Sequence, residues 1–148
     1  MTGALDRNER LLRTRARRRA LQAVYAWQLS GYPMRQVEQQ FAHEQDDETA
    51  DLEYFKALIA GVETQVEQLD AQLGQVLDRP LAQVDPIERA VLRLAAWELI
   101  NRIDVPYKVV LNEALELAKR FGNEQGHAYV NGVLDQLAAR LRRAEYRA

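Results

Sequence analysis

Apolar residues recur at intervals of three and four along most of this chain, and that spacing predicts helices. The clearest run alternates steps of four and three through Phe55, Ile59, Val62, Val66, Leu69, Leu73 and Val76. A side chain returns to the same face of an α-helix every 3.6 residues, whereas a half-buried strand needs strict alternation, and we find no such alternation worth assigning. We therefore expect an all-α fold with one long helix over this run.

The apolar seam from Phe55 to Val76 allows two interpretations. It fits an interior helix of a small bundle, and it also fits a coiled-coil dimer in which the seam faces a second copy. Coiled coils usually sustain their heptads over three to four repeats or more, and this run is at the lower end. The interior helix is the better explanation, and a dimeric helical interaction protein stays open as the alternative.

Glycine, proline and charged residues divide the chain into about six to seven helices. The first is expected to run from the arginine-rich start to Gly31, because no proline or glycine interrupts it. A short helix is expected over residues 34–41, and the acidic segment 43–51 is expected to be a loop. The charges at the end of that loop suit the N-terminus of the next helix.

Asp85 marks the most clearly defined helix start. It supplies a side-chain cap, Pro86 occupies the first helical position, and Glu88 is placed to close a capping box. The helix that follows should reach about Ile103. Glu98 falls on its apolar stripe, where an unpaired carboxylate would be strongly unfavourable, so we expect Glu98 to be paired.

The C-terminal part is expected to contain two further helices. One begins after Pro106 and ends at Gly122, and the last spans residues 130–141. Gly132 lies inside the last helix, where it costs about 1 kcal/mol of helix propensity. We therefore expect another backbone to approach closely at Gly132.

Length and composition limit the chain to one sizeable core. It has 148 residues, 47% of them hydrophobic, which suits a single domain over 1–148, with residues 1–8 expected to be flexible and 142–148 to form a basic tail. It contains no cysteine, which excludes disulfides and thiolate metal sites. We find neither an apolar signal core nor a membrane span, and we expect a soluble, cytoplasmic protein.

The charge distribution is strongly uneven. Residues 1–20 hold seven arginines and two acids, a net charge of +5, whereas residues 36–85 hold twelve acids and two basic residues, a net charge of −10. Such polarity predicts a face that meets phosphate groups. On a helical projection Arg10, Arg15, Arg17 and Arg18 point away from the apolar stripe of this first helix.

Tyr25 projects from the same basic side of the first helix, seven residues after Arg18. An aromatic ring beside arginines can stack on an unpaired base, which predicts a single-stranded nucleic acid as the ligand. A half-buried packing tyrosine is the alternative.

Catalytic motifs are absent from the sequence. His43 and His127 are far apart and lack the spacing of metal ligands, and no phosphate-binding loop, nucleophile elbow or carboxylate pair is found. We therefore expect a binding module without a catalytic site, metal or cofactor.

Several segments in order resemble the NusB family of bacterial transcription antitermination factors. They are Arg15-Ala16-Arg17, Ala23 to Leu29, Tyr54-Phe55, Glu88 to Arg93, Asp104 to Ala114 with Glu116 to Lys119, and Tyr129 to Asp135. Together they extend over about residues 13 to 137, nearly the whole chain.

The resemblance implies a fold of two small helical subdomains and no enzymatic activity. It implies binding to single-stranded boxA RNA in ribosomal RNA leaders, together with NusE, a ribosomal protein of the small subunit. The complex would then join the elongating RNA polymerase with other Nus factors. By position, the resemblance assigns RNA contacts to Arg13, Arg15, Arg17, Tyr25 and Tyr129, to which we add Arg18 from its place on the basic side. It assigns a NusE contact to Glu88.

Two alternatives belong to other classes of protein. The same helical module occurs fused to ribosomal RNA cytosine methyltransferases, but this chain has no space for a cofactor-binding domain and no cysteine nucleophile. The other alternative is the dimer through the apolar seam, and a homodimer is also compatible with the family.

Overall fold

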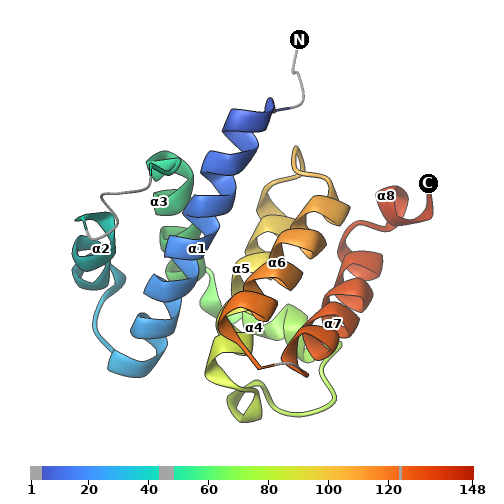
Figure 1. The fold of residues 1–148 in the computed structure, drawn as a ribbon. Helices are drawn as coiled ribbons and strands as arrows, with labels where there is room; N and C mark the ends of the chain where they lie inside the picture. The colour runs from blue at the N-terminus through green and yellow to red at the C-terminus, as the bar shows by residue number, and fades with distance from the viewer. Residues whose placement is uncertain (1–4, 44–48, 124) are drawn as a thin grey trace.

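The structure, a computed structural model, describes residues 5–43, 49–123 and 125–148 (Figure 1). Over these residues it contains α-helices and one short 3-10 turn, and no strand. The elements are α1 (Arg7–Ser30), α2 (Met34–His43), α3 (Leu52–Thr64), α4 (Val66–Gly74), η1 (Leu81–Gln83), α5 (Pro86–Asn101), α6 (Tyr107–Phe121), α7 (Gly126–Leu141) and α8 (Arg143–Arg147). The all-α prediction is confirmed. None of the described helices is both long and apolar enough to cross a membrane.

Helix α5 is the centre of the molecule. It packs against α1 and α3 on one side and against α6 and α7 on the other, and α4 also contacts it (Figure 1). Its side chains are buried almost all round, including Leu92, Ala96 and Leu99. A helix that is apolar all round belongs in the interior of a protein. The helices thus gather in two groups, α1–α3 and α6–α8, which α5 joins into one core.

The long helix expected over the apolar seam is divided in two. Gln65, with φ −109°, ends α3 and precedes α4, and its N–H donates to the Gly61 carbonyl at 2.9 Å. Five seam residues on the two helices, among them Phe55, Val62 and Leu69, are fully buried in the core of this chain, and Val66 and Val76 are partly buried. The coiled-coil dimer is therefore wrong, because the seam is already covered by the rest of the molecule.

Two glycines in helices have opposite surroundings. A Cβ on Gly61 in α3 would lie within 2.7 Å of three atoms of the Trp97 indole, so α3 and α5 can cross closely only with glycine there. Around Gly132 in α7, a Cβ would meet no atom within 4 Å. The expectation of a close backbone approach at Gly132 is wrong, and of these two glycines the one with a close neighbour is Gly61, where that neighbour is a side chain.

The capping box lies at α1 and not at α5. At α1 the Glu9 N–H donates to Asp6 Oδ1 at 2.8 Å, and the Asp6 N–H donates to Glu9 Oε1 at 2.9 Å. At α5 the Asp85 carboxylate accepts from the backbone N–H groups of Ile87 and Glu88, as expected, but no return bond from the Glu88 side chain is found there. Residues 5–8 are thus part of a capped helix start, while residues 1–4 lie outside the described part.

Residues 142–148 are not a basic tail. Arg142 is only 7% exposed and donates to the carbonyls of Leu99 (2.8 Å), Arg102 (2.9 Å) and Val105 (3.1 Å), which lie at and beyond the C-terminus of α5. The last carbonyls of a helix lack partners within the helix, and a cation suits that end of the helix dipole. Glu145 pairs with Arg142 and accepts the Tyr107 N–H at 2.7 Å, so the C-terminal segment fixes the corner between α5 and α6.

Candidate nucleic-acid interface

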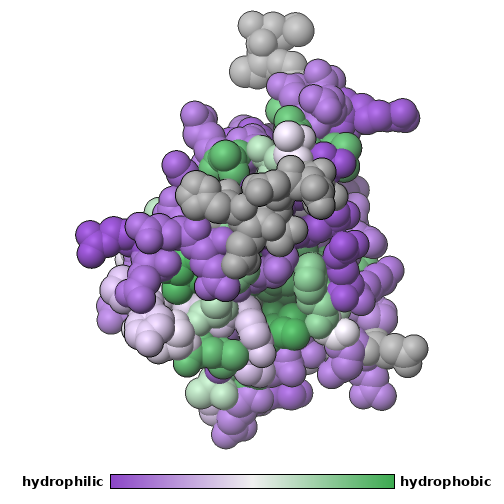
Figure 2. Space-filling view, turned by 60° about the vertical axis from the view of Figure 1, so that its left-hand side comes forward, coloured by the Kyte–Doolittle hydropathy of each residue, from purple (hydrophilic) through white to green (hydrophobic). Residues whose placement is uncertain are grey.

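The arginines of α1 divide into buried and accessible groups. Arg17 and Arg19 are buried, Arg13, Arg15 and Arg18 are partly exposed, and Arg7 and Arg10 are exposed. Figure 2 shows hydrophilic side chains around the start of α1, at the top of the molecule, and apolar side chains reaching the surface lower on the same face. A phosphate can reach only the accessible group.

Arg17 is a structural residue. It is 5% exposed, and its guanidinium donates to Glu98 Oε1 at 2.9 Å and to Oε2 at 2.8 Å, with Glu113 at 3.3 Å. Burial alone would lower the pKa of Arg17, but the Glu98 carboxylate more than reverses this effect and raises the pKa. The expected pairing of Glu98 is confirmed. The structure contradicts the expectation that Arg17 contacts phosphate, because the ion pair occupies its guanidinium away from solvent.

The helical projection missed Arg17 because it assumed a single covered face. Helix α1 packs against α3, α5 and α6, so a side that would face solvent on an isolated amphipathic helix is covered as well. The signal that could have found the pair was Glu98 itself. A carboxylate on a buried stripe requires a cation, and the arginine-rich α1 was the nearest source.

Tyr54 connects the buried pair to the surface. Its hydroxyl donates to Glu98, and burial together with the Glu98 charge raises the pKa of Tyr54. The guanidinium carbons of Arg13, Arg102 and Arg17 lie 4.4, 4.8 and 5.3 Å from the ring centroid. We call Arg13, Arg17, Tyr54, Glu98 and Arg102 the Tyr54 cluster. Its two partly exposed members, Arg13 and Arg102, present positive charge held in place by cation–π contact.

Acidic residues pair with the two partly exposed arginines of the Tyr54 cluster. Asp51 lies 3.8 Å from Arg13, and Asp104 forms a two-pronged pair with Arg102 at 2.9 and 3.0 Å, which lowers the pKa of Asp104. Arg15 donates to the Thr49 carbonyl at 3.2 Å. Arg15 and Arg18 both have partners within the protein. Arg102 was not predicted from the sequence, because it lies far along the chain from the arginines of α1.

The two predicted stacking tyrosines lie on different helices. Tyr25, on α1, is half-buried against the core, as its alternative interpretation expected. Tyr129, on α7, is also half-buried, with the Arg79 guanidinium carbon 4.6 Å from its ring centroid and its hydroxyl 3.4 Å from Asp78. The pKa of Tyr129 is raised, and burial of the ring is the largest cause.

Glu88 lies close to Tyr129 and not on an open acidic surface. It is 8% exposed, and its carboxylate fills the space beside Gly126, at the start of α7. Burial, followed by the nearby Asp85 charge, raises the pKa of Glu88, while Arg79 opposes this shift. The residue assigned to the protein partner is thus a neighbour of an aromatic residue assigned to RNA.

Comparison with known proteins identifies relatives that match nearly the whole chain. The NusB family model matches residues 14–139. A transcription antitermination protein NusB from Xanthomonas oryzae pv. oryzae (strain PXO99A) is 61% identical over 97% of this chain and 92% of its own length. The protein of the same name from Xanthomonas axonopodis pv. citri (strain 306) is 60% identical over 97% of this chain and 90% of its own length.

Solved structures show the same fold. The structure of T. maritima NusB has a TM-score of 0.79 at 25% identity and covers 91% of this chain and 96% of its own. A crystal structure of the antitermination factors NusB and NusE in complex with double-stranded RNA contains a chain with a TM-score of 0.78 at 26% identity, covering 84% of this chain and 93% of its own. The family match, the close relatives and the fold agree, and the chain belongs to the NusB family.

Proposed function

We propose that this protein is a non-enzymatic transcription antitermination factor. With NusE it binds boxA RNA in ribosomal RNA leader transcripts, and the complex joins the elongating RNA polymerase with other Nus factors. Close relatives are named for antitermination, and a related chain has been solved with NusE and RNA. The relatives match this chain over about nine tenths of their own length and are not named as methyltransferases, which favours this function over an RNA-docking module of such an enzyme.

The observation that carries the proposal is the accessible edge of the Tyr54 cluster. Arg13 is stacked on Tyr54, so part of its rotamer freedom is already lost before RNA arrives. The planar guanidinium can hold a phosphate through two hydrogen bonds. Arg15 and Arg18 extend the positive surface along α1, and Tyr25 and Tyr129 supply rings for bases.

Arg13→Ala is the first test of this proposal. We expect weaker binding of boxA RNA and a log-affinity against log-salt slope that falls by about 0.7, the value for one phosphate contact on a single strand. Fluorescence anisotropy over a salt series measures both quantities. Arg35→Ala, at an exposed arginine on α2, is the matched control and should change neither quantity. Equal slopes for Arg13→Ala and wild type would remove Arg13 from the interface.

Tyr129→Ala should reduce RNA affinity by about 1–3 kcal/mol, which is the range for loss of one base-stacking side chain. Tyr129→Phe keeps the ring and loses only the hydroxyl contact with Asp78, so it should retain most of the affinity.

For Tyr25→Ala, both the RNA affinity and the melting temperature are measured. A sharp fall in melting temperature without a specific loss of RNA binding would assign Tyr25 to packing alone.

Glu88→Gln tests the partner contact and has a defined pH signature. Because burial raises the pKa of Glu88, its ionised form is less favourable in the folded state than in the unfolded state. The stability that Glu88 contributes to the wild-type protein is fully present below the pKa that Glu88 has in the unfolded state. It is lost as the pH rises through the pKa that Glu88 has in the folded state. The variant should therefore be as stable as wild type in acid and equally or more stable at neutral pH, as thermal melts from about pH 4 to about pH 8 would show.

The same variant tests whether Glu88 contacts NusE. If the Glu88 carboxylate contacts a basic side of the partner, Glu88→Gln should slow association and reduce its salt dependence. RNA binding by the isolated protein should not fall, because removing an acid cannot weaken phosphate attraction. Unchanged NusE affinity at low salt would place the partner site elsewhere.

A further inference from the structure

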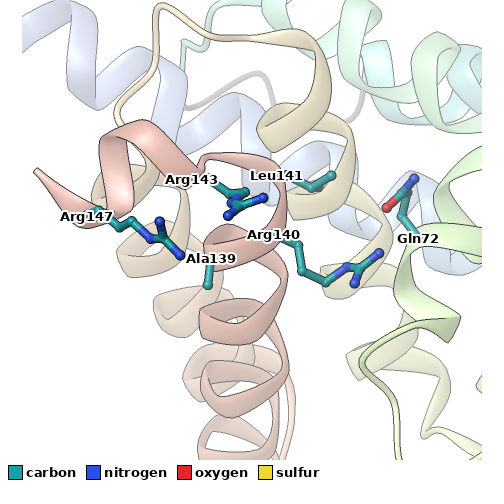
Figure 3. A pocket seen from close by; sticks show the side chains of 6 residues that line it. All are labelled: Gln72, Ala139, Arg140, Leu141, Arg143 and Arg147. Carbon is teal, nitrogen blue, oxygen red and sulfur yellow. The ribbon is translucent and has the colours of Figure 1, made fainter.

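Three arginines surround a hollow at the junction of α7 and α8 (Figure 3). Arg140 comes from the last turn of α7, and Arg143 and Arg147 come from α8, one turn apart. With Gln72, Ala139 and Leu141 they line a space of about 350 Å³ that contains no acidic side chain. In Figure 3 the Arg143 and Arg147 side chains lie near the small Ala139 side chain, whereas the Arg140 side chain extends on the side of Gln72.

The side chains of these three arginines are unpaired within the part of the chain that the structure describes: no hydrogen bond or ion pair joins a guanidinium group of theirs to another described residue. The acidic residues of this segment are engaged elsewhere. Glu145 binds Arg142 and the Tyr107 N–H, and Asp135 accepts the Tyr146 hydroxyl at 2.9 Å. The positive charge of the hollow is therefore not neutralised by its surroundings.

The α7–α8 junction is fixed in place by the neighbouring residues. Arg142 is anchored on carbonyls at the end of α5, and the Tyr146 ring lies 5.3 Å from the Tyr107 ring on α6. Three like charges on a fixed scaffold repel one another, and a bound anion would relieve that repulsion. Guanidinium groups held apart in this way suit phosphates, which accept two parallel hydrogen bonds from one arginine.

Arg102 links the chain next to the hollow with the Tyr54 cluster. The Arg102 side chain lies over Tyr54, whereas its carbonyl accepts a hydrogen bond from Arg142, the neighbour of Arg143. Arg142, between the arginines of the hollow in the sequence, and Arg102, in the Tyr54 cluster, thus both lie at the C-terminal end of α5. One extended ligand with repeated phosphates could contact both groups, which a single small anion could not.

We propose that Arg140, Arg143 and Arg147 form a second phosphate-binding surface, which holds the RNA backbone outside the segment bound at α1. The inference rests on the proposed RNA-binding function. The lining offers charge and one amide but no aromatic ring, so it suits the phosphodiester backbone of RNA and has no platform for a base. It should therefore add affinity without adding sequence preference.

The test compares two RNAs with the double variant Arg143→Glu/Arg147→Glu. One RNA is boxA alone, and the other carries added uridine nucleotides at both ends. The control Arg35→Glu/Lys56→Glu makes the same change in net charge at exposed residues of α2 and α3. Wild type should bind the longer RNA more tightly. The double variant should lose at least about tenfold of its affinity for the longer RNA and about 1.4 of its salt slope, for two phosphate contacts.

The short RNA separates this inference from the proposed function. Arg13→Ala should weaken binding of the short RNA, whereas Arg143→Glu/Arg147→Glu should affect it no more than the charge control does. If the short RNA depends on Arg13 but the longer RNA gains nothing in wild type, the second surface is wrong and the proposed function stands. If wild type fails to bind the short RNA with NusE present, the proposed function itself fails. Loss of NusE binding with unchanged RNA binding would assign the surface to a protein and overturn the inference.

Both substituted side chains are exposed, and folding is checked by the melting temperature. If charge reversal disturbs α8, Arg143→Gln/Arg147→Gln removes the charge while keeping long polar side chains, and the same loss of salt slope is expected.

Discussion

Glu98→Ala is expected to destabilise the protein by about 3–5 kcal/mol, the range for removing one partner of a buried ion pair. The substitution leaves the Arg17 guanidinium buried with Glu113 as its remaining partner, and it removes the acceptor of the Tyr54 hydroxyl. For a chain of this length we expect a fall in melting temperature on the order of 10 °C. Urea unfolding monitored by circular dichroism measures the free energy directly.

Two further variants separate charge burial from packing at this site. Glu98→Gln keeps an acceptor for Tyr54 but loses the charge that faces Arg17, so it should be less harmful than alanine. The double variant Arg17→Met/Glu98→Leu removes both charges and fills the space with apolar atoms, and it should recover much of the loss. If Glu98→Ala costs less than about 1 kcal/mol, which is typical of surface pairs, the ion pair is not as buried as the structure shows.

Gly61→Ala is expected to cost about 1–3 kcal/mol or more, as overpacking of a core usually does. The new Cβ would overlap the Trp97 indole, and Trp97 is itself buried between helices. The collision requires α3 and α5 to separate, which should reduce the unfolding free energy even though alanine favours the helix. Thermal and urea unfolding of the two proteins measure the difference.

Gly132→Ala is the matched control for that measurement. It makes the same chemical change inside a helix, but with no atom within 4 Å of the new Cβ. It should stabilise the protein by about 0.5–1 kcal/mol, because alanine loses less backbone entropy than glycine in a helix. Equal effects at both positions would contradict the close crossing of α3 and α5. Gly132→Ala should also leave RNA affinity unchanged unless a ligand backbone lies against α7.

Local signals predicted the local structure well. Asp85 caps α5 as expected, and the helix expected after Pro106 begins at Tyr107 and ends before Gly122. Such signals act within a few residues of the chain, so the sequence alone reveals them. The all-α class followed from the apolar spacing for the same reason, since each helix shows its own period.

Contacts between distant segments could not be predicted in this way. The apolar seam continues across Gln65 without a change of period, yet α3 ends there and α4 begins, and both helices pack on α5. The role of Arg142 depends on carbonyls about forty residues earlier, and nothing near Arg142 indicates them. The candidate RNA-binding site was likewise predicted only where it depends on local sequence. The basic segment was located, but the burial of Arg17 and the contribution of Arg102 depend on tertiary packing.

The order of Arg17 and Glu98 along the chain has a consequence during synthesis. The two residues are 81 positions apart, so α1 leaves the ribosome well before the carboxylate that neutralises Arg17. At about 5–20 residues per second, the delay is about 4 to 16 seconds. Arg142, which caps the C-terminus of α5, emerges later still. Throughout this interval Arg17 lacks the Glu98 carboxylate that neutralises it in the folded protein, and only the arrival of α5 withdraws Arg17 from solvent.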